Sequence, residues 1–257
     1  MMFSIFWGLV LACACIAIAF YLDYFFRLRF SGRLLRGVGR LALSLILVVL
    51  VVTLASAINA LWATLLLSLL MVFVASLLAV VHGKLKARSM LLPIFAGMAV
   101  ATLIMSPIMA LWVTSVKDSF SAHIFLPLVG FLTGSMSGVL SKSLRVYYMG
   151  LEHHRQLYDY LLGNGCTHRR AMDYFIRRAL QSVCSSLLRR YGAASAFLLP
   201  VCTYALVLSG WDVLSSAVFE FALCMSILAA SLLSLIVALL VSRRMLFDDY
   251  GRFQPVP

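Results

Sequence analysis

The residue best suited to chemistry is Glu220, an acidic side chain about two turns inside the apolar run from Ser215 to Val241. An ionised side chain costs a few kcal/mol or more in hydrocarbon, so a carboxyl group kept there is a candidate functional group. We interpret Glu220 as a cation or proton site that faces the interior of a helix bundle. The neighbouring apolar run contributes further candidates for that site, Cys202, Thr203 and Tyr204. The alternative is a protonated glutamic acid bonded to a neighbouring helix, or one that reaches water at the outer surface.

A second candidate is the polar region from about 145 to 191. Two amphipathic segments flank a break that contains Gly163, Asn164 and Gly165, and Thr167 is placed to cap the second segment. Two helices at the membrane surface, joined by a glycine turn, would form a rigid knob that can dock in a groove of a cytoplasmic partner. The alternative is an amphipathic surface helix with a glycine break and no partner.

Three glycines, Gly130, Gly134 and Gly138, repeat at four-residue spacing in another apolar run. Small residues at this spacing let two helices approach closely in a membrane. We interpret the stripe as helix packing, within the chain or at a dimer seam, in preference to a ligand site.

The composition indicates a membrane protein. The chain has 257 residues, of which 63% are hydrophobic and 12% are charged, whereas soluble domains are about half apolar and a quarter charged. Lipid must therefore be the solvent for most of the chain. The formal net charge of +12 is typical of cytoplasmic loops here, and we expect no nucleic acid. The six cysteines show no CxxC pair, so we expect neither disulfides nor zinc.

The apolar runs predict an all-α integral membrane protein with about seven transmembrane helices in a single transmembrane domain, residues 1–257. Each crossing needs roughly 20 residues. The expected helices cover about residues 3–22, 41–58, 60–81, 90–114, 124–144, 193–208 and 215–241.

The basic residues predict the orientation. Every Lys and Arg except Lys117 lies after the first, third or fifth expected helix, at the end of the fifth, or in the C-terminal tail. Positive loops stay in the cytoplasm, so we expect the N-terminus outside and the C-terminus inside. The region from about 145 to 191 is then a cytoplasmic helical loop between helices five and six.

Catalytic motifs are missing. Ser141-Lys142-Ser143 lacks the glycines of a nucleotide-binding P-loop, and no HExxH or GxSxG motif occurs. We expect no enzyme and no cofactor bound by this chain, so ATP and Mg²⁺ would act only through a separate ATPase.

Asp159, Gly165 and Ile176 are similar in type and spacing to the coupling loop of ABC-transporter permeases. From about Gly39 to Arg244 the chain resembles the FetB-type family of ABC permeases, implicated in bacterial iron export and related to a plant aluminium-tolerance permease. The matching points are Gly39-Arg40, Pro127-x-x-Gly130-x-x-x-Gly134, Asn164-Gly165-Cys166-Thr167 followed by Arg169-Arg170-Ala171, and Pro200 with Gly210 and Asp212.

The resemblance implies the membrane-spanning subunit of an ATP-driven exporter in the bacterial inner membrane. It would be a homodimer that binds a cytoplasmic ABC ATPase and moves a metal ion, iron by resemblance. Coupling to the ATPase would fall to Asp159, Gly163, Gly165, Thr167, Arg170 and Ile176. The cargo path would include Glu220, Cys202, Thr203, Tyr204 and Ser135.

The cargo and the mechanism stay open at this point. The family carries methionines and an asparagine where this chain has Phe131, Ser135, Cys202 and Thr203, and thioethers are soft metal ligands. No metal-ligand set is therefore assigned from the sequence. Two other classes are considered: an ATP-independent, cation-coupled carrier that uses Glu220, and a structural or assembly membrane protein without cargo.

Overall fold

The fold is given by a computed structural model, which describes residues 10, 14, 17, 21, 31–58, 61–83, 87–113, 121–154, 158, 160, 163–166 and 168–246. These residues are almost all helical and include no strand, which confirms the predicted all-α class. The chain divides into two compact units, Met1–Leu54 and Ala55–Pro257. A single transmembrane domain over the whole chain stays a prediction. Most of the first expected helix lies outside the described residues.

In the first unit, most of the described chain belongs to helix α2 (Ser31–Ile58). It begins about ten residues before the expected start at Leu41. Arginine is a good helix former, so the helix continues through the basic stretch at its start. Hydropathy thus locates the part of a helix that suits lipid, and misses the polar extension of the same helix. The apolar side chains of Leu43, Ile46 and Val49 are exposed within this unit.

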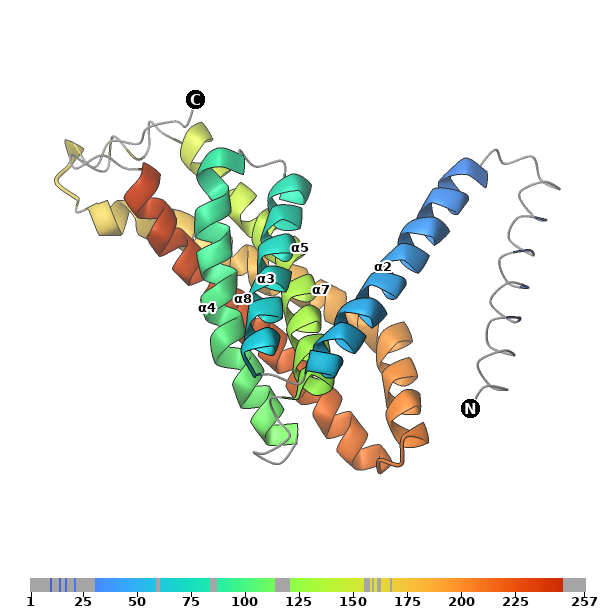
Figure 1. The fold of residues 1–257 in the computed structure, drawn as a ribbon. Coiled ribbons are helices and arrows are strands. Elements are labelled where there is room, and N and C mark those ends of the chain that lie inside the picture. Colours follow the sequence, from blue (N-terminus) through green and yellow to red (C-terminus); the bar gives the residue numbers. More distant parts are fainter. Residues whose placement is uncertain are drawn as a thin grey trace. The chain divides into compact units, whose positions relative to one another are not determined.

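The described residues of the second unit form five long helices, which Figure 1 shows. They are α3 (Leu61–Gly83), α4 (Ala87–Val113), α5 (Ala122–His153), α7 (His168–Leu208) and α8 (Val213–Leu246). Helix α4 packs along α8, and α3 packs along α5. Helices α7 and α8 form a hairpin around a turn at Ser209–Asp212, seen between the orange and red segments of Figure 1. Gly210 has φ +97 in this turn, a backbone conformation that glycine adopts without strain.

Four helices in the described part of the chain are long and apolar enough to cross a membrane. They cover Leu61–Gly83, Met90–Trp112, Ile124–His153 and Val213–Arg243, which agrees with the third, fourth, fifth and seventh expected helices. Leu199–Leu208 forms a shorter apolar segment at the end of α7. The outer surface of these helices carries exposed apolar side chains such as Trp62, Leu66 and Leu103, which suits contact with lipid. The chain is therefore a multi-pass membrane protein.

Helix α7 differs from the expectation. We expected a surface helix after the glycine break and a separate sixth helix from about Ala193, whereas one helix of 41 residues runs through both. Its 41 residues have a contour length of about 60 Å at 1.5 Å per residue, and Figure 1 shows that the helix changes direction between its gold and orange parts. The amphipathic stripe of its first half is buried in the main core. The stripe consists of Ala171, Met172, Phe175, Ala179, Val183 and Leu187.

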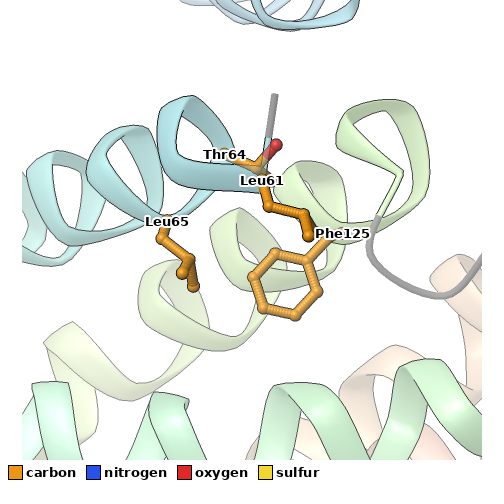
Figure 2. A pocket seen from close by; sticks show the side chains of 4 residues that line it. All are labelled: Leu61, Thr64, Leu65 and Phe125. Atoms are coloured by element: carbon orange, nitrogen blue, oxygen red, sulfur yellow. The ribbon is translucent and has the colours of Figure 1, made fainter. Parts of the chain in front are cut away.

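A small apolar cavity of about 240 Å³ lies where α3 and α5 begin. Figure 2 shows the side chain of Leu61 directed at the ring of Phe125, with Leu65 one turn further along α3. Thr64 supplies the only hydroxyl among its four lining residues. Because no ionisable side chain lines this cavity, we assign it no role in binding charged ligands.

Candidate functional site

The candidate site is a cavity of about 510 Å³ between α5, α7 and α8. Its volume falls in the range of small-molecule sites, about 300–1,000 Å³. Most of its wall is apolar, with a few polar groups from each helix. The polar members are Ser135 of α5, Arg190, Tyr191 and Cys202 of α7, and Glu220 and Cys224 of α8. The apolar members are Phe131, Leu187, Leu199, Ala205, Leu206, Phe219, Leu223 and Ile227.

Glu220 is the buried acidic group of this cavity. Its side chain is only 7% exposed, and the hydroxyl Oγ1 of Thr203 donates to its Oε1 over 3.0 Å. The same hydroxyl lies 2.9 Å from the carbonyl oxygen of Leu199. A threonine hydroxyl carries one hydrogen, so Thr203 can donate a hydrogen bond to only one of these two oxygen atoms at a time. The carboxyl group therefore keeps capacity to bind a ligand in the cavity.

Phe219 of the cavity wall packs against two tryptophan rings. Phe219 lines the cavity and stacks on Trp112 of α4, with ring centroids 6.2 Å apart and planes 11° apart. Trp211, in the turn between α7 and α8, packs against the same ring at 5.7 Å. These contacts hold the Phe219 ring in the cavity wall.

Arg190 provides a positive charge in the same cavity. Its Nη1 donates to the carbonyl oxygen of Ser135 over 3.3 Å. Gly138 makes room for the guanidinium group, since a Cβ on that glycine would lie 2.9 Å from Nη2 of Arg190. From the sequence Arg190 was predicted only as one of the positive charges of the cytoplasmic loop, and its place in the cavity wall was not predicted.

The two charged groups occupy different levels of the α7–α8 hairpin. Glu220 follows the turn by eight residues, or about 12 Å of helix, and Arg190 precedes the end of α7 by eighteen residues, or about 27 Å. A bilayer core is about 30 Å thick. Glu220 therefore lies within the candidate span Val213–Arg243, and Arg190 lies further from the turn.

Two thiols belong to the cavity wall, Cys202 and Cys224. Both are free. Cys224 was not predicted, although it follows Glu220 by four residues and so shares its helix face. Among the described residues, no group of three or more His, Cys, Asp or Glu side chains is close enough to hold a metal ion. The thiols and Glu220 therefore line one space without forming a ready-made metal site.

The other predicted cargo-path residues separate into two groups. Ser135 lines the cavity, and Thr203 reaches it through Glu220. Tyr204 is 66% exposed and does not belong to the lining. Consecutive helical residues point about 100° apart, so Cys202, Thr203 and Tyr204 cannot all face one cavity.

The predicted coupling residues lie at the opposite end of α7 from the turn. Gly163, Gly165 and Arg170 are exposed, and Ile176 is half-buried against the main core. Gly165 has φ +75, where a side chain would strain the backbone. Asp159 and Thr167 lie outside the described residues.

The glycine stripe of α5 serves more than one purpose. A Cβ on Gly130 would lie 2.8 Å from Cε of Met71, so this glycine lets α3 approach α5. Gly138 makes room for Arg190, and Gly134 has no neighbouring atom within 4 Å of the Cβ position. Among the described glycines, the tightest position was not predicted from the sequence. It is at Gly97 of α4, where a Cβ would lie 2.4 Å from the carbonyl oxygen of Ser234.

These features define a multi-pass helical membrane protein with a cavity between three of its helices. The sequence matches the Uncharacterised protein family (UPF0014) over residues 6–247. The chain belongs to this family and is a permease-like membrane protein. No curated protein and no solved structure shows a significant match.

Proposed function

We propose that this chain is the membrane-spanning permease subunit of an ATP-driven ABC transporter, working as a homodimer with a separate cytoplasmic ATPase. In this proposal the cavity between α5, α7 and α8 is the cargo site. ATP binding would bring the ATPase subunits together, and their motion would reach the cavity through the segment around Gly165. The cargo would be a cation, and its transport out of the cell is the direction that the family resemblance implies.

The continuity of α7 is the observation that carries this proposal. One helix connects the exposed docking segment near Arg170 to the cavity-lining residues Cys202 and Leu206. Between these ends, a buried stripe anchors the helix in the main core. A packed helix transmits a displacement along its length, so a movement at the docking end would shift one wall of the cavity.

The metal-ion cargo is the finer part of the proposal. Glu220 and two thiols line the cavity, and such groups can ligate borderline metals. The described residues lack a cluster of three ligands, so a metal ion would need a rearrangement within the cavity or ligands from a second copy. The proposal is therefore stated for a cation, with iron as the ion that the resemblance implies.

Affinity purification from the native membrane tests the mechanism. We expect the tagged protein to retain an ATP-binding partner in stoichiometric amount, identified by mass spectrometry, and to show ATPase activity. Replacing Gly165 with valine should remove the partner or the activity, whereas Gly37→Ala, at an open position in α2, should leave both unchanged. A pure, well-folded protein with neither partner nor ATPase activity would contradict the proposal.

A second candidate is an ATP-independent, cation-coupled carrier. The burial of Glu220 and its contact with Thr203 favour it. This mechanism requires Glu220 for every transport step, so Glu220→Gln would abolish transport in vesicles without ATP. A structural or assembly role without cargo is a third class, and a dimer that purifies without ATPase or transport would favour it.

A further inference from the structure

We propose that the cavity binds an organic cation with an apolar body, for which Glu220 supplies the counter-charge and Phe219 an aromatic surface. This inference names the ligand class of the proposed cargo site and rests on the proposed function to that extent. It follows from the distribution of polar and apolar groups over the cavity wall. Eight of the fourteen lining residues are aliphatic or Phe side chains, and Glu220 is the acidic residue among them.

The apolar wall favours a cation with a dispersed charge. A small metal ion must exchange its water shell for several ligands from the protein, and stripping that shell without replacements is very costly. Glu220 would be its main ligand here, because the described residues provide no cluster of three ligating side chains. An organic cation holds its water weakly, needs one opposite charge, and gains from burying its apolar groups against Leu199, Leu223 and Ile227.

The aromatic groups point to the same ligand class. Phe219 is held in place by Trp112 and Trp211, at centroid distances of 6.2 and 5.7 Å. Phe219 and Glu220 both line the cavity, so a bound cation has an aromatic ring and a carboxyl group in the same wall. Cationic groups without N–H donors bind to such aromatic faces.

The exposed part of the cavity wall would also let an organic cation enter the cavity from the lipid. Phe131 is 43% exposed, and Cys202 and Ala205 are exposed too. All three line the cavity, so the cavity opens toward the apolar layer that surrounds the helices. Arg190, the positive residue of the lining, belongs to α7 twelve residues before Cys202, or about 18 Å along the helix. It therefore leaves the Glu220 end free for a cation.

Equilibrium binding of tetraphenylphosphonium tests the inference. The full-length protein is purified in nanodiscs, and bound radiolabelled probe is measured against empty nanodiscs to remove partition into lipid. We expect saturable binding with at most one probe per cavity. Glu220→Gln, which keeps the side-chain volume, should weaken binding at least about thirtyfold. Glu152→Gln, at an exposed position of α5, should leave the affinity unchanged.

A second pair of variants keeps the test valid if Glu220→Gln fails to fold. Ala205→Phe places a ring at the cavity wall and should abolish binding, whereas Ala217→Phe adds the same ring at an exposed site on α8 outside the lining. Phe219→Leu should weaken binding about threefold to tenfold, since it removes the aromatic face and keeps an apolar residue. Folding of each variant is checked by size-exclusion chromatography.

Two results would overturn the inference. One is saturable binding of tetraphenylphosphonium that neither Glu220→Gln nor Ala205→Phe changes. The other is a protein that binds Zn²⁺ in a Glu220-dependent way but does not bind tetraphenylphosphonium. Co-purification of the ATPase is scored separately. If no ATPase co-purifies but the protein still binds the probe in a Glu220-dependent way, the result would contradict the ATP-driven mechanism and support the ligand class. A preparation with the ATPase but without such binding would overturn the ligand class alone.

Discussion

The hydroxyl of Thr203 lies 3.0 Å from Oε1 of Glu220, and this hydrogen bond joins α7 to α8 seventeen residues apart in the chain. It gives the buried carboxyl group a partner inside the apolar layer. The bond also fixes Glu220 at the wall of the cavity, next to Cys202. The bond is thus one of the contacts that join α7 to α8, together with the hydrogen bond from the Tyr191 hydroxyl to the carbonyl oxygen of Cys224.

Removing the hydroxyl of Thr203 should destabilise the protein. Thr203→Val keeps the shape of the side chain but leaves Glu220 without this donor, at an expected cost of about 1–3 kcal/mol in the free energy of unfolding. Thr203→Ser should restore most of the loss. The midpoint of thermal unfolding in detergent measures the effect. Thr53→Val, at an exposed position of α2, is the control. Equal effects at both positions would refute a special role for the Thr203–Glu220 bond.

The contact between Gly97 and Ser234 should tolerate no side chain. A methyl group at Gly97 would meet the backbone carbonyl of Ser234 at 2.4 Å and the Cβ of Ala238 at 3.0 Å, so α4 and α8 would have to move apart. We expect Gly97→Ala to lower the free energy of unfolding by about 1–3 kcal/mol. Gly134→Ala has open space and should gain stability from better helix propensity. Chemical denaturation of both variants in mixed micelles compares them, and a stable Gly97→Ala protein would contradict this packing.

Gly165 should be sensitive because of its backbone conformation. Its φ of +75 costs an L side chain about 1–2 kcal/mol, so Gly165→Val should distort the docking segment and lower ATP-dependent transport in proteoliposomes. Gly163→Val adds the same bulk, also in open space, without a positive φ at that position. A smaller loss for Gly163→Val is expected. If the two variants lose the same amount of transport, the loss comes from the size of the added side chain and not from backbone strain at Gly165.

The continuity of α7 can be tested by breaking it. Ala193→Pro removes a backbone donor in the interior of α7, between the docking segment and the cavity-lining residues Cys202 and Leu206, at a cost of about 3 kcal/mol. We expect transport to be lost while ATP hydrolysis by the bound ATPase continues, because the two ends of α7 would move independently. Ala193→Ser serves as the control, since serine keeps the helix. Full transport by a folded Ala193→Pro protein would show that α7 does not act as one rigid element.

The predicted orientation gives a labelling test. Cys166 follows the glycine turn before α7, and Ser209 lies in the turn between α7 and α8. In a variant without the other cysteines, a membrane-impermeant maleimide should label Cys166 only in inside-out vesicles. Ser209→Cys, in a background without Cys166, should be labelled only in right-side-out vesicles. The reverse pattern would show that the charge distribution was misinterpreted.

The apolar helices could be predicted from the sequence because each one is a local property. A span needs about 20 apolar residues, and that pattern is visible without knowing the neighbours. Expected and observed boundaries agree for α3 and α4, whereas α2, α5 and α7 extend into polar sequence. These extensions could not be seen in hydropathy, because arginine and alanine continue a helix in water as readily as leucine does in lipid.

The sequence by itself determined that this is a multi-pass membrane protein with one acidic side chain, Glu220, deep in an apolar run. The reason is the cost of charge in hydrocarbon, which makes such a residue stand out. The tertiary structure alone decided that Arg190 and Cys224 share a cavity with Glu220, and that α8 packs against α4 at Gly97. These relations join segments far apart in the chain, and they depend on how helices pack, which no local pattern encodes.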